Sequence, residues 1–310
     1  MQLKQLNLYG TKLLYSRLRL RMFSFIKKEI DARRDQIQRL PGLMRLYHYA
    51  YRILKPRGII LTETQDLRMY VHAADDVITP EILAYGVHEE DETELFKKII
   101  KPSMVIVDIG ANIGYYSLLA AKLVGEKGKV YVFEPDPLNY NLLVANIETN
   151  HFTNIIPIQK VVSNKAGKVK FFLDKGNFGA HTLSEKNIQT ERNGYIEADA
   201  ITLDGFFKGE KENKVDFIKM DVQGAEGLVI EEALEIIKHN DLKIMMEFWP
   251  QGLRNLGTDP LTLLKALHDY GFTIRVMRKD EMHELKKIAL VMEVAEEKRY
   301  VNLLLEKRHE

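Results

Sequence analysis

One stretch constrains the fold more than any other: VIVDIGANIGYYS at residues 105–117, an apolar run followed at once by a glycine-rich turn. The apolar run predicts a buried strand, and the turn predicts a sharp change of direction into a helix. A strand, a glycine turn and a helix in this order are typical of a domain that binds a nucleotide cofactor. The stretch therefore predicts an α/β fold with a cofactor site at the turn.

The rest of the chain repeats this alternation. Helix-length segments separate most of its apolar runs, which lie at residues 104–109, 130–133, 155–162, 217–220 and 244–248. The pattern predicts a Rossmann-like, doubly wound α/β fold whose mostly parallel sheet is covered on both faces. The connection between the third and fourth runs reads as extra strands rather than one crossover helix. The final runs, FTIRVMR and YVNLLLEKR, predict a C-terminal antiparallel hairpin.

The N-terminal part has a different character. Residues 1–60 contain 14 Lys and Arg against 3 Asp and Glu, although the whole chain has a net charge of only +1. The pattern predicts helices over residues 1–54, with a break at residues 41–42. It predicts short strands after them and a further helix over residues 80–101. An apolar stripe recurs at a spacing of four at Leu14, Leu18, Met22, Ile26 and Ile30.

Two interpretations of this basic helical extension remain open. A helix with an apolar stripe and basic flanks can lie on an anionic membrane surface. The same stripe is also what a helix packed on a domain shows. The sequence contains no cysteine and no apolar run of the roughly 18 residues that a membrane span needs. We therefore expect a cytoplasmic protein, with peripheral membrane contact as the alternative to simple packing.

The spacing of the turn decides which cofactor it suits. The dinucleotide fingerprint G-x-G-x-x-G needs glycines where this chain has Asn112 and Tyr115, and no G-x-x-x-x-G-K-[ST] phosphate loop is present. The observed series of Asp108, Gly110, Asn112 and Gly114 instead resembles the first motif of class I S-adenosylmethionine-dependent methyltransferases. That cofactor carries no phosphate. The turn needs only to let the backbone approach its amino-acid and ribose parts, and glycine removes side chains that would block this approach.

A second acidic residue completes the predicted cofactor site. Glu134 ends the second predicted strand, beyond Gly114. A carboxylate there can accept hydrogen bonds from both ribose hydroxyls, although it can also simply cap the turn before Pro135. Together, these features predict S-adenosylmethionine as the cofactor. The residues expected to contact it are Asp108, Gly110, Ala111, Asn112, Gly114, Tyr115, Tyr116, Glu134, Pro135, Val162, Ser163 and Asp221.

Five segments resemble the FkbM-type methyltransferases: residues 105–137, 139–150, 201–206, 215–226 and 243–250. The resemblance implies a class I methyltransferase domain over residues 80–310, preceded by a basic helical extension with short strands at residues 1–79. It also implies methyl transfer, commonly to a hydroxyl oxygen, with acceptors that include sugars of cell-surface glycans and polyketides. Gln223 departs from the family pattern, in which glutamate is more frequent, so we assign position 223 no charge-dependent role.

Three residues are the main candidates for the chemistry. Asp221 follows the fourth apolar run and Glu247 lies in the fifth, at the strand ends where doubly wound folds bind ligands. Asp221 is expected to orient the acceptor or take its proton, with capping of the following helix as the alternative. A carboxylate such as Glu247 is costly to bury without a purpose. Histidine titrates near neutrality, so His181 is a candidate to remove the proton, although a lone loop histidine is more often solvated. Glu89 and Glu90 either close over the cofactor or begin a helix.

These observations predict O-methylation of a sugar hydroxyl in a glycan or glycolipid. RNA methylation is one alternative, with the basic extension contacting phosphates. The sequence has no recognisable RNA-binding module, so a nucleic-acid partner is not expected. A second alternative is a protein that binds S-adenosylmethionine without catalysis. No metal site is predicted, because nothing in the spacing of Asp221, Glu247 and His181 requires one.

Overall fold

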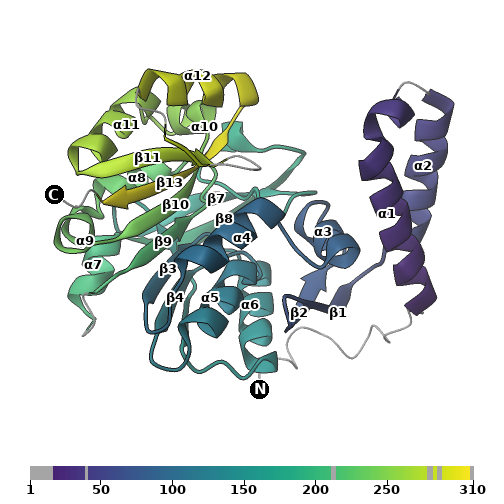
Figure 1. Ribbon diagram of the computed structural model, residues 1–310, viewed down its shortest axis with the longest axis horizontal. Coiled ribbons are helices and arrows are strands. Elements are labelled where there is room, and N and C mark those ends of the chain that lie inside the picture. The colour runs from purple at the N-terminus through teal and green to yellow at the C-terminus, as the bar shows by residue number, and fades with distance from the viewer. Residues whose placement is uncertain (1–16, 39–40, 211–213, 278–281, 285–287, 308–310) are drawn as a thin grey trace.

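The computed structural model describes residues 17–38, 41–210, 214–277, 282–284 and 288–307. Its centre is an eight-stranded sheet in the order β12-β11-β13-β10-β9-β3-β4-β5 (Figure 1). Five neighbouring strands are parallel: β3 (Val105–Ile109), β4 (Lys129–Phe133), β5 (Ile155–Ile158), β9 (Phe217–Met220) and β10 (Lys243–Phe248). The Rossmann-like, mostly parallel sheet predicted from the alternation is confirmed.

The remaining strands form an antiparallel edge. β13 (Val301–Lys307) lies between β10 and β11 (Phe272–Met277) and is antiparallel to both. The predicted antiparallel pairing at the C-terminus is confirmed. It is not a simple hairpin, because β12 (Met282–Glu284) and α12 (Ile288–Lys298) lie between the two strands along the chain.

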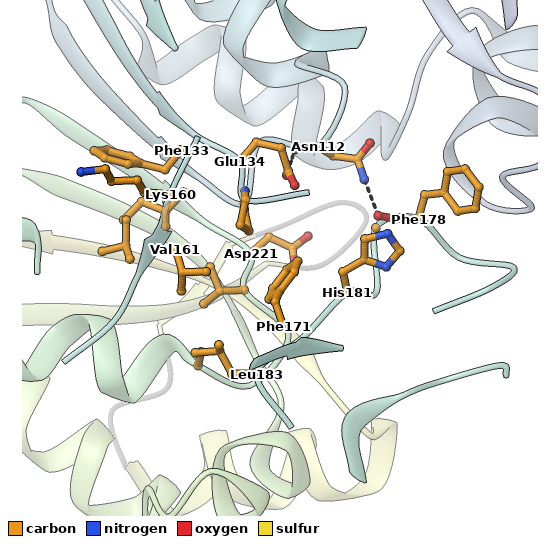
Figure 2. A pocket seen from close by; sticks show the side chains of 17 residues that line it. Asn112, Phe133, Glu134, Lys160, Val161, Phe171, Phe178, His181, Leu183 and Asp221 are labelled. Carbon is orange, nitrogen blue, oxygen red and sulfur yellow. Dashed lines mark hydrogen bonds between the residues drawn. The ribbon is translucent and has the colours of Figure 1, made fainter. Parts of the chain in front are cut away.

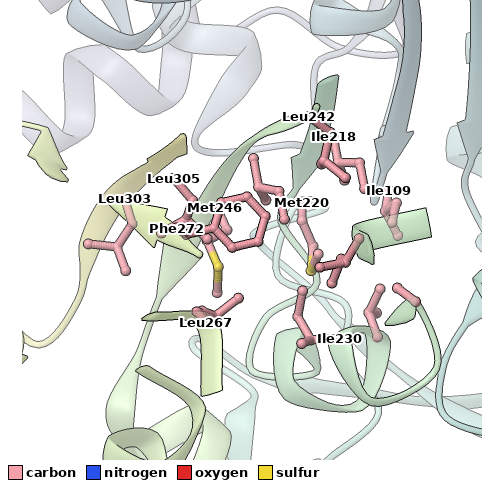
Figure 3. Packing of buried hydrophobic residues seen from close by; sticks show 14 of the residues in the cluster. Ile109, Ile218, Met220, Ile230, Leu242, Met246, Leu267, Phe272, Leu303 and Leu305 are labelled. Carbon is pink, nitrogen blue, oxygen red and sulfur yellow. The ribbon is translucent and has the colours of Figure 1, made fainter. Parts of the chain in front are cut away.

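Helices cover both faces of the sheet (Figure 1). Successive side chains of a strand point to opposite faces, so Val107 and Ile109 of β3 join one buried cluster while Ile106 joins the other. Figure 3 shows the first cluster, with Leu267 and Ile230 beside the strand residues. Its helices are α7 (Leu203–Lys208), α8 (Glu226–Glu231), α9 (Leu234–His239), α10 (Pro250–Asn255), α11 (Pro260–Asp269) and α12. The second cluster includes α4 (Glu90–Ile99), α5 (Tyr115–Val124) and α6 (Pro137–Thr149).

The connection between β5 and β9 contains the extra strands predicted from the sequence. β6 (Val161–Val162), β7 (Gly167–Asp174) and β8 (Arg192–Ile201) form a separate sheet in the order β6-β8-β7, and the short helix η2 (Glu185–Asn187) lies between β7 and β8 along the chain. The apolar run predicted at residues 155–162 is thereby divided. Its first part stays in the main sheet as β5, and its second part pairs with β8.

One predicted helix is two helices in the structure. Residues 80–101 were expected to be continuous, but α3 (Ile78–Tyr85) ends before α4 begins. Gly86 adopts a φ of 70° and donates its amide hydrogen to the carbonyl of Ile82, which ends α3. The break places Glu89 at the start of α4, where it faces the cavities described below.

The N-terminal part forms the predicted helices and strands, α1 (Arg17–Gln38), α2 (Pro41–Leu54), β1 (Ile59–Thr64) and β2 (Leu67–His72). Within the expected apolar stripe, Ile26 and Ile30 are half-buried but Met22 is 46% exposed, and the neighbouring Phe23 is buried instead at 1% exposure. Leu14 lies outside the described residues. The Phe23 ring lies 5.1 Å from that of Tyr51 on α2, and Ser24 Oγ donates to the Ala84 carbonyl on α3. Within the described residues, no helix combines the length and apolarity needed to cross a membrane.

Candidate active site

The site lies at the point where the sheet changes its direction of growth. From β3 the chain adds β4 and β5 on one side, and it later adds β9 and β10 on the other. Ligands of doubly wound sheets bind at the carboxyl ends of the strands beside such a switch point. Three cavities of about 490, 420 and 240 Å³ lie there, and Asp221 lines all three.

We name each cavity after one of its residues. The Glu134 cavity is the largest and is shown in Figure 2; it includes Gly110, Glu134, Pro135, Val162, Phe171, His181 and Asp221. The Tyr116 cavity includes His88, Glu89, Asp108, Ala111, Tyr116, Lys219 and Asp221. The Glu247 cavity, the smallest, includes Glu89, Glu92, Lys219, Asp221, Glu247 and Asn302.

The glycine turn has the left-handed backbone that its sequence predicts. The φ angles of Gly110, Asn112 and Gly114 are 82°, 53° and 90°. A Cβ atom on Gly110 would lie 2.0 Å from the Asp221 carbonyl oxygen, and one on Gly114 would lie 2.5 Å from Leu143 Cδ1. Both glycines are therefore required by their backbone conformation and by protein packing, a reason additional to the expected approach of a ligand.

Glu134 fastens the turn to the loop after β4. Its Oε2 accepts the amide hydrogen of Asn112, and its Oε1 accepts that of Asp136, both at 2.8 Å. Each carboxylate oxygen retains capacity for a further donor, so Glu134 can also accept two ribose hydroxyls. Burial raises the pKa of Glu134 to about 8, against the lowering effect of the two backbone donors. Additional donors from a ligand would favour the ionised form.

A loop from the inserted sheet covers the Glu134 cavity. The Phe178 carbonyl accepts a hydrogen bond from the side-chain amide of Asn112 at 2.8 Å (Figure 2). It also accepts one from the side-chain amide of Asn139 at 3.0 Å. Asp174 holds the base of the loop by accepting the amide hydrogens of Asn177 and Thr190. The insertion is therefore part of the site rather than a separate appendage.

His181 lies in this loop and faces the Glu134 cavity. Its Nδ1 accepts the amide hydrogen of Asp174 at 3.0 Å, and its ring lies near those of Phe171 and Phe178. Burial lowers the pKa of His181. The hydrogen bond places the proton of the neutral ring on Nε2, so neither nitrogen can accept a proton in this arrangement. The predicted role of His181 as a base has no geometric support here, and its position suits shaping of the cavity.

Lys219 is the central cation of the site, and sequence reasoning missed it. It lies in β9, is buried, and its Nζ lies 4.4 Å from the centre of the Tyr116 ring. Burial alone would lower the pKa of Lys219, but the surrounding carboxylates, with Asp221 and Glu89 foremost, raise it above its usual range. A lysine inside an apolar strand is a detectable signal, because a buried charge needs partners.

Two acidic residues flank Lys219 in the Tyr116 cavity. Asp108 Oδ2 accepts the hydroxyl hydrogen of Ser117 at 2.6 Å, and burial raises the pKa of Asp108. Glu89 Oε2 accepts the hydroxyl hydrogen of Tyr116 at 3.1 Å. Burial would raise the pKa of Glu89, but His88 and Lys219 lower it overall. Glu89 therefore both begins α4 and faces the cavity, whereas Glu90 is exposed and lines none of the three cavities.

Asp221 lies where the three cavities meet. Its carboxylate Oδ1 accepts a hydrogen bond from Gln223 Nε2 at 2.7 Å. The alternative role of Asp221 as a helix cap is wrong, because the cap position of α8 is Ala225, without any side-chain cap bond. Glu226 Oε1 instead accepts the amide hydrogens of the loop residues Val222 and Gly224. Burial raises the pKa of Asp221, and Lys219 opposes this effect.

Gln223 connects Asp221 to the inserted segment. Its side-chain oxygen accepts a hydrogen bond from Gln189 Nε2 at 2.7 Å, so its amide nitrogen is directed at Asp221. Its own backbone carbonyl accepts hydrogen bonds from Thr182 and Asn187. A glutamine at this position therefore presents a donor to Asp221, where a glutamate would present another negative charge.

Carboxyl groups dominate the Glu247 cavity. Glu247 of β10 faces Asp221 and Glu92 across it, and Glu92 accepts a hydrogen bond from the Asn302 side chain. Burial raises the pKa of Glu247 well above its usual range, and the nearby carboxylates, with Asp221 first, raise it further. Burial and Glu89 do the same for Glu92. These carboxyl groups therefore favour the protonated form, which can donate a hydrogen bond as well as accept one.

The structure brings most of the predicted cofactor residues together. All of them line the Glu134 cavity or the Tyr116 cavity except Gly114 and Ser163. Gly114 packs against α6, and the Ser163 amide donates to the Ile201 carbonyl. Across the described ranges, no group of three or more His, Cys, Asp or Glu side chains has the arrangement needed to hold a metal ion.

Comparison with known proteins places this site in a family. The methyltransferase FkbM domain model matches residues 108–274. The chain is also 29% identical over 149 residues to a probable cobalt-precorrin-6B C(15)-methyltransferase (decarboxylating) of Sulfolobus acidocaldarius, covering 45% of this chain and 77% of that one. It is 36% identical over 72 residues to ribosomal RNA large subunit methyltransferase E of Chromobacterium violaceum, covering 22% of this chain and 34% of that one.

Solved structures with a similar arrangement have low sequence identity to this chain. Methyltransferase FkbM from Methylobacillus flagellatus is 16% identical with a TM-score of 0.40, covering 75% of this chain and 55% of that one. TYW2 of M. jannaschii in complex with AdoMet is 14% identical with a TM-score of 0.42, covering 82% and 88%. The family model, by contrast, matches more than half of the 310 residues and includes the turn, Glu134, Asp221 and Glu247. The chain therefore belongs to the methyltransferase FkbM domain family and is an S-adenosylmethionine-dependent methyltransferase.

Proposed function

We propose that this protein transfers the methyl group of S-adenosylmethionine to a sugar hydroxyl of a glycan or glycolipid. The observation that carries the proposal is the Glu247 cavity, in which carboxyl groups and the Asn302 amide surround a space beside Asp221. Carboxylates accept hydrogen bonds from hydroxyl groups, and protonated carboxyls also donate them. A space lined in this way suits an acceptor that carries several hydroxyl groups.

The other two cavities suit the two ends of the cofactor. In this proposal the Glu134 cavity holds adenosine, with the ribose hydroxyls on Glu134, and the Tyr116 cavity holds the amino-acid end. That end carries an ammonium group, which Glu89 and Asp108 complement, and a carboxylate, which Lys219 complements. The sulfur then lies between the two cavities, next to Asp221, which lines both.

The proposed transfer is an in-line displacement. The acceptor oxygen forms a bond to the methyl carbon while the bond from that carbon to sulfur breaks, and S-adenosylhomocysteine is released. The hydroxyl proton passes to a carboxylate, for which Asp221 is the proposed base because it lies between the cofactor cavities and the acceptor cavity. Glu247 is proposed to hold the acceptor by a hydrogen bond rather than to take its proton, because its raised pKa favours the neutral form.

The carboxyl groups disfavour the alternative of RNA methylation. An RNA acceptor would bring phosphates next to the ionised Glu89 and the proposed base Asp221, and like charges at close range repel. The similarity to a ribosomal RNA methyltransferase covers only 34% of that protein. Membership of a methyltransferase family favours transfer over cofactor binding alone.

The test is transfer of a labelled methyl group from S-adenosylmethionine to fractionated cell extract. We expect the label in material that glycosidase releases and ribonuclease does not. The label should also resist mild base, which cleaves carboxyl methyl esters but leaves methyl ethers intact. Label that ribonuclease removes, or label in a base-labile ester, would refute the proposed acceptor class.

A further inference from the structure

The helical hairpin formed by α1 and α2 presents apolar side chains to solvent. Phe25 on α1 and Leu46 and Tyr49 on α2 are between 63% and 65% exposed. Figure 1 shows the two helices side by side at one end of the molecule, with α3 between them and the sheet. Ordinary packing on the domain does not account for these side chains, because it buries Phe23 and leaves these three outside.

The exposed residues lie away from the contacts that fix the hairpin. On α1, Ser24 and Asp31 bond to Ala84 and Tyr85 of α3, and Phe23 faces α2. Phe25 is two residues from Phe23, and residues two apart on a helix point to different sides. The side chain of Phe25 therefore does not share the contact that Phe23 makes with α2. On α2, Leu46 and Tyr49 are three residues apart and share one face. Each helix therefore exposes apolar side chains to solvent in addition to its contacts with neighbouring helices.

The charge of the segment is strongly positive. Residues 1–60 contain 14 Lys and Arg against 3 Asp and Glu. Two of the acidic residues on α1 pair with cations of the same helix, Glu29 with Arg33 and Asp31 with Lys27. Arg21, Arg45 and Arg57 are exposed. The hairpin thus combines exposed aromatic and leucine side chains with a surplus of arginine.

We propose that this hairpin docks on an anionic lipid surface. Amphipathic helices with basic residues and exposed Phe, Leu or Tyr bind in the headgroup region of anionic membranes, where the charges and the apolar side chains both contribute. A second copy of the chain would bring a like charge to the same face, and a nucleic acid would leave the apolar side chains unsatisfied. The combination therefore favours a lipid surface over either alternative.

Docking would bring the active site to the membrane. α1 is fixed to α3 through Ala84 and Tyr85, and Ile78 at the start of α3 lines the Tyr116 cavity. The hairpin is also tied to the loop after β2 by an ion pair between Lys55 and Asp76. An acceptor carried on a lipid would then be presented close to the cavities. The docking itself does not depend on the proposed function.

The test is co-sedimentation of the full chain with vesicles, without any methyl transfer. We expect binding to phosphatidylcholine vesicles that contain phosphatidylglycerol, little binding to phosphatidylcholine alone, and release in 1 M salt, where the screening length falls to about 3 Å. Replacing Phe25, Leu46 and Tyr49 together by serine should weaken binding by at least about tenfold. Serine at Tyr195, Leu261 and Leu290, three exposed positions elsewhere, should leave binding unchanged.

Three results would overturn the proposal. One is equal sedimentation with neutral and anionic vesicles, or with neither. Another is a concentration-dependent dimer in analytical ultracentrifugation that the hairpin variant abolishes, which would identify a second copy as the occupant. The third is loss of vesicle binding by both triple variants alike. Thermal melts of the two triple variants, matched to the parent chain, establish that any loss of binding does not arise from unfolding.

Discussion

The Glu134 cavity and the Glu247 cavity lie on either side of Asp221 but are built differently. The first is held by backbone groups, since Glu134 accepts the amide hydrogens of Asn112 and Asp136. The second is held by polar side chains around Lys219 of β9: carboxyl groups from α4, β10 and the loop after β9, and the Asn302 amide from β13. Backbone geometry can be specified by a short motif, whereas a charge cluster depends on elements far apart in the chain. In the proposed function, the Glu134 and Tyr116 cavities form a cofactor half that suits a constant ligand, and the Glu247 cavity forms an acceptor half that can differ with few substitutions.

Asp221 belongs to both halves, and its replacement gives the largest expected effect on activity. Asp221→Asn keeps the shape of the side chain but removes the proposed proton acceptor. Turnover should fall by about 10²- to 10⁴-fold, the usual contribution of a general base. The affinity for S-adenosylmethionine, measured by calorimetry, should change by no more than a few-fold, because asparagine keeps the size of the side chain and its oxygen can still accept the hydrogen bond from Gln223.

Asp199→Asn is the matched control, because Asp199 is exposed on β8 and pairs with Lys168 at the surface. It should leave both turnover and cofactor affinity at the level of the parent protein. Turnover of the Asp221 variant close to that of the parent would exclude a proton-accepting role. An equal loss of cofactor affinity would instead assign Asp221 to the cofactor half.

Glu134→Gln tests the cofactor half alone. The substitution removes the charge that the ribose hydroxyls would bond and places an amide donor opposite a backbone N–H. Loss of a hydrogen bond to a charged group costs about 1.5–3 kcal/mol, so affinity for S-adenosylmethionine should fall by about 10- to 150-fold. Turnover at saturating cofactor should change far less. Unchanged affinity in calorimetry would remove Glu134 from the ribose site.

The raised pKa of Glu134 predicts a pH dependence of the same binding step. Burial raises that pKa to about 8 in the protein alone, and hydroxyl donors from the cofactor would favour the ionised carboxylate and lower it. Binding below pH 8 must therefore release a proton. Affinity should be constant above about pH 8 and weaken by up to tenfold per unit below it. Calorimetry in buffers of different ionisation enthalpy measures this proton, and the Glu134→Gln variant should release none.

The difference between the two halves also explains what the sequence could predict. The strand, the glycine turn and Glu134 follow from local spacing, and all appear in the structure as expected. Lys219 is a local signal within an apolar strand, but the strand pattern does not show which partners surround the lysine. One of these partners, Glu89, lies in a part of the chain for which the sequence predicts a continuous helix. Gly86 is itself a local signal for the end of a helix, but the helical spacing of the apolar residues after it favours a continuous helix.

The inserted segment shows a second limit. The sequence predicts its extra strands. It does not predict that Phe178 lines the Glu134 cavity and bonds to Asn112, or that Gln189 donates a hydrogen bond to Gln223. These contacts join residues that are far apart in the sequence, and no periodicity records them. His181 illustrates the reverse case, in which residue type alone suggests a role that the local hydrogen bonds do not support. Its residue type suggested a base, whereas its neighbours occupy Nδ1 and leave Nε2 as a donor.

Gln223 offers the finest test of the acceptor half. Its amide donates to Asp221 at 2.7 Å, so Gln223→Glu replaces a donor by a like charge and should raise the pKa of Asp221. The acidic limb of the pH profile of kcat should move upward by about one unit, and turnover at neutral pH should fall by less than tenfold. Cofactor affinity should remain unchanged, because Gln223 lines neither cofactor cavity.

Gln223→Met removes the donor without adding charge and should shift the profile less. A profile that is the same in all three proteins would show that Asp221 does not titrate in the catalytic step, and the acceptor half would then bind its ligand without taking its proton.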